Sequence, residues 1–295
     1  MSGLPRATID EVITRWEVAR LPLILVEGSY DKKIIELTQT EDFCPAQIRD
    51  IDVWTADAVD ADIGMLLRHG IETSGAKQRV IGFIREMESL DRQNGICGVI
   101  DRDIDQFIPV SHSSDALLYT DEGAMELFFW NESIFRIVLV QFNCQDFALR
   151  KDALKKLYDS ITEACRILAF IRASSYHGCN FSMHDSEKSL SMVNDQVFLD
   201  WEKYLMQCRI KADLSASVIN RVDAYINEHG ANRERTYLNG HDLMWLITFA
   251  IKSCTKGPVR QAEQSLVESS FLAVGVSKCS LEGSQLLQGL KAWRA

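Results

Sequence analysis

Long apolar runs are absent from this 295-residue chain. A helix that spans a bilayer needs about 18 or more consecutive apolar residues, and no stretch of the sequence approaches that length. The first ten residues, MSGLPRATID, also lack the apolar core of a secretory signal. We therefore expect a cytoplasmic protein with no membrane partner.

Clustered cysteines and the common catalytic motifs are missing as well. The eight cysteines are scattered and include no C-x-x-C pair, which argues against a disulfide framework and against a structural zinc site. The sequence contains no Walker A, G-x-G-x-x-G, H-E-x-x-H or nucleophile-elbow motif. It is therefore unlike a P-loop NTPase, a Rossmann dehydrogenase or a zinc hydrolase.

Positive charge is in short supply. Aspartate and glutamate number 42 against 32 lysines and arginines, and the formal net charge is −10. Such a balance argues against a protein that coats long nucleic acid through a general basic surface. It leaves room for a local basic groove, and a bound metal ion would neutralise part of the excess acid.

The first half of the chain alternates short apolar runs with helical stretches. Strands are expected at residues 23–26, 51–54, 96–100 and 117–119. Helices are expected at residues 9–20, 30–38, 58–68 and 77–92, and a further helix should start at Asp121 and carry Glu126. Strands that alternate with helices predict an α/β fold, in which a mostly parallel, Rossmann-like sheet is flanked by helices.

Helical periodicity dominates the second half of the chain. Helices are expected at residues 149–173, 194–209, 215–229, 241–254, 259–274 and 281–293. We therefore predict two parts: a metal-binding catalytic domain at residues 1–141, and a helical C-terminal region at residues 142–295. The second part would serve substrate recognition, dimerisation or docking to a partner.

Carboxylates follow two of the expected strands. Glu27 comes directly after the first strand, whereas Asp101 and Asp103 follow the third. Because the carboxyl ends of neighbouring parallel strands meet at one edge of a sheet, these three side chains would converge there. Like charges at one place favour a divalent cation, and oxygen ligands suit Mg²⁺, with Mn²⁺ as a substitute. The alternative is a solvated acidic turn and an ordinary helix-start carboxylate.

Several other residues are candidates at the same edge, each with a simpler alternative. Asp105 and Glu126 could be further metal ligands, or a solvated and a surface carboxylate. Lys32 and Lys33 could contact a substrate phosphate, although lysines early in a helix are commonly solvated. His241 lies at the expected start of a helix, where a phosphate could bind. A cap for that helix is the simpler explanation.

The motif V-E-G-x-x-D at Val26–Asp31, followed by D-R-D-x-D at Asp101–Asp105, resembles the TOPRIM domain of primases, topoisomerases and OLD-type nucleases. The segment T-D-E-G-A-M-E-L-F-F at Thr120–Phe129 is similar to the acidic helix start of TOPRIM proteins encoded beside ABC-type ATPases. The overall layout looks most like the AriB-type effectors of PARIS anti-phage defence systems.

This resemblance implies a Mg²⁺-dependent endonuclease in which Glu27, Asp101 and Asp103 are the metal-binding and catalytic carboxylates. It implies a bacterial effector that an AriA-like ABC-type ATPase holds inactive until a phage protein triggers its release. The released effector would act as a homodimer that cleaves host tRNA. Two alternatives remain: a DNA-nicking TOPRIM endonuclease, and a catalytically silent TOPRIM docking subunit of the ATPase complex.

Overall fold

The computed structural model describes residues 6–40, 50–72, 75–92, 94–107, 114–176, 187–208, 212–229, 235, 237–255, 263–278 and 283–294. The chain divides into two compact units. The first comprises Met1–Arg102, Val110–Asp121 and Ser280–Ala295, and the second comprises Asp103–Pro109 and Glu122–Cys279. Each unit is described by itself below.

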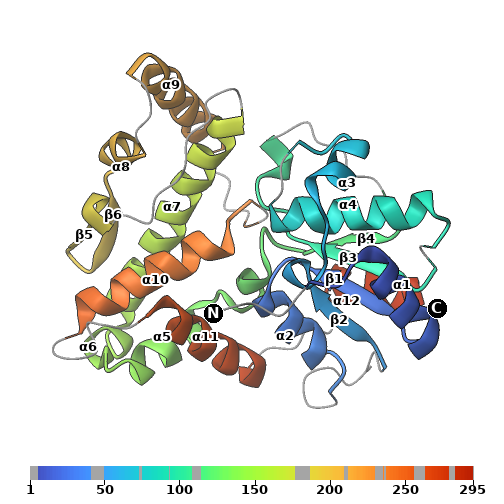
Figure 1. Ribbon diagram of the computed structural model, residues 1–295. Helices are drawn as coiled ribbons and strands as arrows, with labels where there is room; N and C mark the ends of the chain where they lie inside the picture. The colour runs from blue at the N-terminus through green and yellow to red at the C-terminus, as the bar shows by residue number, and fades with distance from the viewer. Residues whose placement is uncertain are drawn as a thin grey trace. The chain divides into compact units, whose positions relative to one another are not determined.

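The first unit is built on a parallel sheet (Figure 1). Its strands are β1 (Leu23–Val26), β2 (Asp52–Thr55), β3 (Ile96–Ile100) and β4 (Leu117–Tyr119), in the spatial order β2-β1-β3-β4. Every residue of β1 and of β3 is buried, as expected for central strands covered on both faces. The predicted α/β class with a parallel sheet is confirmed.

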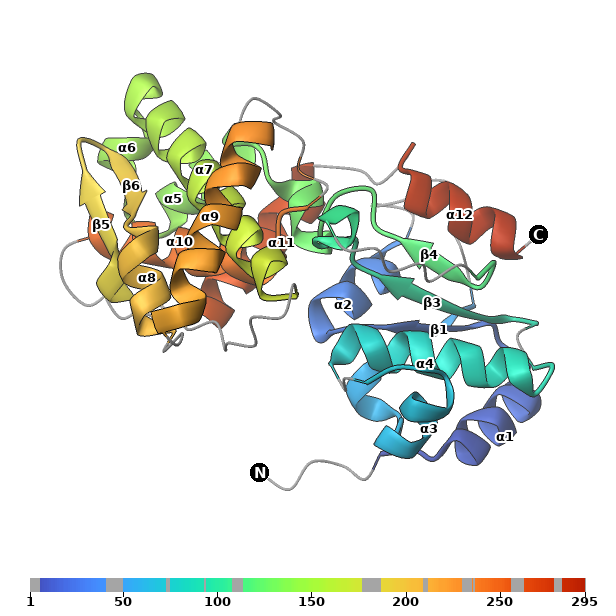
Figure 2. The same cartoon turned by 90° about the horizontal axis from the view of Figure 1, so that it is seen from above.

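Helices cover both faces of this sheet (Figure 2). On one face lie α1 (Ile9–Ala19), α3 (Ile63–Arg68) and α4 (Ala76–Ser89), and on the other lie α2 (Ser29–Leu37) and α12 (Gln285–Arg294). α4 packs so closely on β3 that a Cβ atom added at Gly98 would lie 2.8 Å from the Val80 side chain and 2.9 Å from that of Ile84. Gly98 thus permits the close approach of helix and strand.

Helix starts in this unit are set by side chains that accept backbone hydrogen bonds. A capping box formed by Thr8 and Glu11 is present at the start of α1. The helix predicted at residues 58–68 begins later, at Ile63. A short 3₁₀ helix occupies Ala56–Ala58, and the Asp62 side chain caps α3 by accepting a hydrogen bond of 2.7 Å from the Met65 N–H.

The second unit is mainly helical. Its α-helices are α5 (Glu132–Gln141), α6 (Gln145–Ala148), α7 (Lys151–Tyr176), α8 (Trp201–Gln207), α9 (Ala212–His229), α10 (Gly240–Cys254) and α11 (Gln264–Lys278). Short 3₁₀ helices lie at η2 (Asp105–Phe107), η3 (Met125–Phe129) and η4 (Glu187–Ser189). α7 packs against α9 and α10, and α10 also packs against α11. The predicted helical C-terminal region is therefore confirmed in its broad character.

One predicted helix of this region is wrong in its first part. Residues 194–199 belong to an antiparallel hairpin formed by β5 (Leu190–Val193) and β6 (Gln196–Leu199). Its two turn residues, Asn194 and Asp195, have φ values of 50° and 65°, which is the left-handed conformation that a two-residue hairpin turn requires. The helical part, α8, begins only after Asp200, whose side chain caps it.

The compact units do not follow the predicted boundary at residue 141. The chain passes from one unit to the other near residues 102 and 121, and α12 returns to the first unit, where it packs on β4. A sequence pattern does not show where an amphipathic C-terminal helix docks. The assignment of catalysis and recognition to separate parts stays a prediction.

Replacing Gly98 by alanine should destabilise the protein. The added methyl group would overlap the side chains of Val80, Ile84 and Leu117, and overpacking of this kind costs about 1–3 kcal/mol. Urea unfolding would measure the change in free energy of unfolding. The control is Val18→Ala on α1, where 79% of the side chain is exposed and the change should stay within about 0.5 kcal/mol. Equal stability of the two variants would contradict the close packing of α4 on β3.

Candidate active site at the carboxyl edge of the sheet

The candidate site starts from the pairing of the two central strands. Val26 of β1 is the register partner of Val99 of β3, so both strands end at the same edge. Glu27 follows β1 directly, and its Oε1 atom accepts a hydrogen bond of 2.9 Å from the backbone N–H of Asp101. The structure therefore brings Glu27 and the start of the D-R-D-x-D segment together. The catalytic role of both residues stays a prediction.

Asp31 has a structural role at the same edge. Gly28 is the N-cap of α2, and its N–H donates a hydrogen bond of 2.8 Å to Asp31 Oδ2. Only 8% of Asp31 is exposed. The last residue of the V-E-G-x-x-D motif thus fixes the turn that carries Glu27, because it satisfies a backbone donor that the helix leaves open.

Lys77 is a residue of this edge that the sequence interpretation missed. It lies in the first turn of α4, and only 8% of it is exposed. Its Nζ donates a hydrogen bond of 2.6 Å to the carbonyl oxygen of Asp101 and lies 3.4 Å from that of Arg102. A helix that precedes a parallel strand begins at that strand's carboxyl edge. Lys77 is the second residue of the helix that precedes β3, so the sequence could have predicted its place at this edge.

Arg102 secures the same turn from its other side. Its backbone N–H donates to Thr120 Oγ1 at 3.2 Å, and its Nε donates to the Thr120 carbonyl at 2.6 Å. The guanidinium also lies 5.8 Å from the centre of the Tyr119 ring. The turn after β3 is thus held by Glu27, Lys77 and Thr120, which leaves the position of Asp101 well determined.

Asp103 is the first residue of the second unit, and it is fixed there by separate contacts. Its backbone has a φ of 45°, in the left-handed region, and its N–H donates to the Gly123 carbonyl at 2.7 Å. Asp103 Oδ1 accepts a hydrogen bond of 2.9 Å from Asn239 Nδ2. Asn239 is also the N-cap of α10, through its Oδ1 and the Asp242 N–H. One amide side chain thus starts α10 and holds Asp103, a contact that no sequence pattern indicated.

A buried ion pair lies beside Asn239. Arg172 of α7 binds both carboxylate oxygens of Asp242, at 2.7 and 2.9 Å. Burial by itself lowers the pKa of Arg172, but the charge and hydrogen bonds of Asp242 and the charge of Asp103 outweigh it, so that the pKa is raised. The ion pair keeps the first turn of α10 attached to α7 and places a permanent cation within electrostatic range of Asp103.

Glu126 also lies at the start of α10. A Cβ atom added at Gly240 would lie 1.9 Å from Glu126 Oε2, so the carboxylate rests directly against the backbone there. The helix expected to start at Asp121 is wrong, because η3 begins only at Met125. Asp121 instead caps α12, since its two carboxylate oxygens accept hydrogen bonds of 2.7 and 2.8 Å from the Gln285 and Leu286 N–H groups.

The remaining candidates lie on exposed or half-buried surface. Lys32 forms an i,i+4 ion pair of 3.5 Å with Glu36 on α2, and Lys33 is exposed beside it. His241 Nδ1 lies 3.2 Å from Gln264 Nε2, and the cap of α10 is Asn239 instead of this histidine. Asp105 is the first residue of η2 and is half-buried. Their roles toward a phosphate or a metal stay predictions.

The donor chemistry of this edge fits Mg²⁺. Among the described residues, no group of three or more histidine, cysteine, aspartate or glutamate side chains is arranged to hold a metal ion. Mg²⁺ is usually held by only one or two carboxylates together with water and substrate oxygens, so Glu27 and Asp101 satisfy the requirement by type and number. The Asp101 N–H donates its hydrogen bond to Glu27 Oε1 and so fixes the orientation of this carboxylate.

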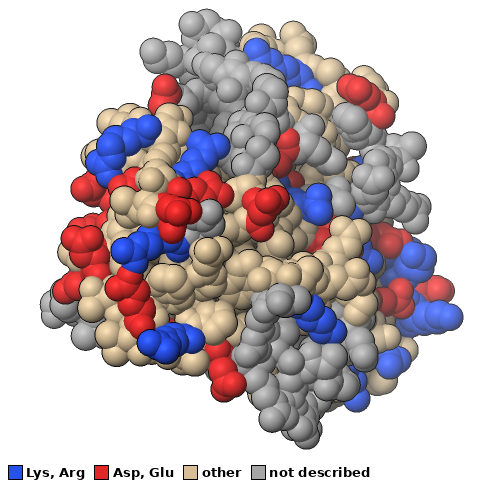
Figure 3. All heavy atoms as spheres, turned by 90° about the vertical axis from the view of Figure 1, so that its right-hand side faces the viewer, with Lys and Arg blue, Asp and Glu red and all other residues tan. Residues whose placement is uncertain are grey.

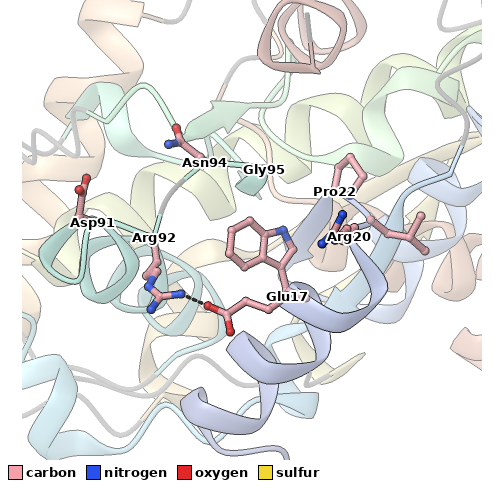
Figure 4. A pocket seen from close by; sticks show the side chains of 9 residues that line it. Glu17, Arg20, Pro22, Asp91, Arg92, Asn94 and Gly95 are labelled. Carbon is pink, nitrogen blue, oxygen red and sulfur yellow. Dashed lines mark ion pairs between the residues drawn. The ribbon is translucent and has the colours of Figure 1, made fainter.

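A cavity of about 470 Å³ in the first unit lies at the opposite, amino edge of the sheet (Figure 4). Its lining includes Pro22 and Gly95, which precede β1 and β3, and an ion pair joins Glu17 to Arg92 across it. This cavity is separated from Glu27 by the length of the strands. It does not belong to the candidate site.

Comparison with known proteins identifies no relative: no protein-family model and no curated protein matches this chain. Within the described part of the chain, none of the helices has the length and apolar character that crossing a bilayer requires.

Replacing Lys77 by methionine should destabilise the protein by about 1–3 kcal/mol, because the part-buried Asp101 carbonyl would lose the hydrogen bond from Lys77 Nζ. Lys32→Met is the matched control, since the exposed pair with Glu36 contributes little. Urea unfolding of both variants would measure the difference. Equal stability would show that Lys77 does not hold the turn after β3.

Proposed function

We propose that this chain is a Mg²⁺-dependent nuclease with a TOPRIM-type domain. The observation that supports the proposal most directly is the junction of Glu27 with the turn after β3. A glutamate follows one central strand, a D-x-D segment follows its parallel neighbour, and a 2.9 Å hydrogen bond joins them. The resemblance places the glutamate after the first strand and the D-x-D segment after the third, and this order of motifs along the chain supports the proposal.

Each candidate residue has a separate role in the proposed hydrolysis of a phosphodiester. Glu27 and Asp101 would hold Mg²⁺, and Asp103 is assigned with them because it follows Asp101 by two residues in the sequence. When bound, the ion orients the phosphodiester, activates a water molecule and offsets charge on the leaving oxygen. Lys77 and Thr120 keep the turn in place. Glu27 would act as a metal ligand or as the general base that accepts a proton from water.

A compact folded RNA is the substrate that suits this chain best. The net charge is −10, and Figure 3 shows acidic and basic side chains intermingled on the face it draws, without a broad basic surface among the described residues there. A shape recognised at a few phosphates is compatible with this charge, whereas long duplex DNA calls for many cationic contacts. We therefore propose tRNA, with DNA nicking as the alternative that keeps the same site.

The biological role rests on the resemblance. We propose that the chain is the toxic effector of an anti-phage defence system and that a partner ABC-type ATPase of the AriA type holds it inactive. Triggering by a phage protein would release an active homodimer that stops translation by cleaving host tRNA. The rival is a silent docking subunit of the ATPase complex. The presence of Glu27, Asp101 and Asp103 together favours the enzyme.

The experiment that tests the nuclease is cleavage of total cellular RNA and of plasmid DNA with Mg²⁺ or with chelator. Glu27→Gln is the informative variant, because its amide oxygen can still accept the Asp101 N–H hydrogen bond while the negative charge is lost. We expect discrete tRNA fragments from the wild type and a loss of roughly 100-fold or more in the variant. Glu202→Gln, at an exposed position of α8, should retain full activity.

Other outcomes separate the alternatives. Plasmid nicking with intact tRNA would keep the site and move the function to DNA. Equal activity of wild type and Glu27→Gln would contradict the role of Glu27. Inactivity of the wild type alone and also with the partner ATPase and its trigger would favour the docking subunit.

Metal binding can be measured without turnover. Mg²⁺ that binds only the folded chain should raise its stability, by about 2.7 kcal/mol at a concentration of 100 times Kd. Thermal unfolding with MgCl₂, against NaCl at equal ionic strength, should show this shift in the wild type and a much smaller one in Glu27→Gln. An equal shift in both proteins would remove Glu27 from the metal site.

A further inference from the structure

A cavity of about 780 Å³ lies in the second unit, apart from the residues assigned to the candidate site. Its walls are the middle of α7, the β5–β6 hairpin that packs against α7 (Figure 1) and the segment that precedes α10. The volume falls within the range of about 300–1,000 Å³ that is usual for ligand sites. We call this space the α7 cavity. Its lining includes apolar, aromatic and charged residues: Ile167, Val193, Tyr158, Phe198, Arg166 and Arg235.

Trp130, which is buried, holds two of these side chains in place. Its carbonyl oxygen accepts a hydrogen bond of 3.2 Å from the Tyr158 hydroxyl, and it also accepts one from Arg235 Nη1. Its indole ring stacks on the Tyr158 ring, with the two centroids 4.4 Å apart. The phenol and the guanidinium of this wall are therefore positioned in advance, which lowers the entropic cost of binding a ligand.

Two arginines and two acidic residues contribute charge to the lining. Glu163 forms an ion pair with Arg166, and Asp159 forms one of 2.9 Å with Lys155, so each of these carboxylates has a cationic partner. Arg235 differs from the other cations, because the carbonyl oxygen that it binds is neutral. This bond orients the guanidinium without neutralising it. The wall formed by Arg235 can therefore attract an anion such as a phosphate.

The α7 cavity adjoins the segment that holds Asp103. Arg235 and Leu238 line the cavity. The next residue, Asn239, donates the hydrogen bond of 2.9 Å to Asp103 Oδ1. The Gly123 N–H donates to the Arg235 carbonyl at 3.0 Å, and the Gly123 carbonyl accepts from the Asp103 N–H at 2.7 Å. The same short segment thus forms a wall of the cavity and positions a candidate metal ligand.

The uncharged part of the lining suits the faces of nucleobases. Tyr158 and Phe198 are aromatic, and 58% of Phe198 is exposed although it is a large apolar residue. Val193, in the other strand of the hairpin, is 51% exposed. Bases of single-stranded nucleic acid stack on aromatic side chains, while cationic groups bind the phosphates between them. Both kinds of group meet in this cavity.

We propose that the α7 cavity binds a single-stranded segment of the RNA substrate, with bases against the aromatic and apolar lining and a phosphate at Arg235. The inference rests on the proposed function and adds Arg235 to it as a substrate-binding residue. Binding here would hold the adjoining nucleotides beside the segment that positions Asp103. The bases of a duplex are stacked and paired, so only unpaired nucleotides could use this lining.

RNA binding by the full-length chain can be measured without cleavage, in the presence of a chelator. The probe is a fluorescein-labelled, unstructured RNA oligonucleotide of mixed sequence, followed by fluorescence anisotropy. Arg235→Gln should weaken binding about 10-fold and reduce the slope of log K against log salt concentration by about 0.7, which is the contribution of one phosphate contact on a single strand. Lys156→Gln removes an exposed charge of α7 outside the lining and should leave Kd nearly unchanged.

A second variant keeps the test independent of any folding defect at Arg235. Gln196 is an exposed residue of the lining, so Gln196→Glu adds a negative charge to the cavity without disturbing the core. It should weaken RNA binding several-fold. Gln145→Glu adds the same charge at an exposed position of α6 outside the lining, and it should bind RNA like the wild type.

The outcomes distinguish this inference from the nuclease proposal. Equal weakening by Gln196→Glu and Gln145→Glu would overturn the inference, because it would show a general effect of net charge. An unchanged Kd in both Arg235→Gln and Gln196→Glu, or no RNA binding by the wild type, would overturn it as well. If the wild type cleaves no nucleic acid but the two cavity variants lose RNA binding, the inference stands and the nuclease proposal fails.

Discussion

The candidate site depends on the parallel pairing of β1 with β3. Each strand is short and buried on both faces, and the half-buried carboxylate of Glu27 that follows β1 is stabilised by a hydrogen-bond partner. The pairing supplies the partner, because the register brings the backbone N–H of Asp101 to Glu27. A backbone donor is independent of side-chain identity at residue 101. It fixes the glutamate while leaving both carboxyl groups as candidate ligands.

Backbone atoms of the acidic turn are held by groups from neighbouring elements. Lys77 reaches its carbonyl groups from α4, and Thr120 receives Arg102 after β4. A buried ammonium group is costly unless it is hydrogen-bonded, and here Lys77 Nζ donates to the backbone carbonyl oxygens of the turn. These hydrogen bonds satisfy polar groups of the backbone, and they also hold the turn that carries Asp101 at the carboxyl edge of the sheet. Structural stability and site geometry are linked at this turn.

α10 has a comparable place in the second unit. Most residues of the helix are buried, and its first turn is tied to α7 by the Arg172–Asp242 pair. Asn239 at its start holds Asp103, and the Ile251 carbonyl oxygen in its last turn lies 3.9 Å from Cys144 Sγ. Both ends of the helix are thus held by contacts with other segments of the second unit. Interpretations based on sequence motifs treat these residues as unrelated.

Local periodicity and capping chemistry were sufficient for most of the elements. The buried strands, the capping box of α1 and the start of α10 all follow from residues within one or two turns of each other. One of the failures has a local cause and the other a long-range one. Asn194 and Asp195 both have positive φ and form a hairpin turn, although the spacing of apolar residues predicted the start of a helix there. Asp121 caps a helix far along the chain instead of starting its own.

By itself, the sequence determined the α/β class, the four strands of the parallel sheet and the position of Glu27 and Asp101 at strand ends, because these depend on short-range patterns of burial. Only the tertiary structure decided that Lys77 and Thr120 secure the acidic turn, that Asn239 holds Asp103, and that α12 returns to the sheet. Each of these contacts joins residues distant in the chain, and their formation depends on how whole elements pack. The spacing of side chains along one element carries no information about a partner on another.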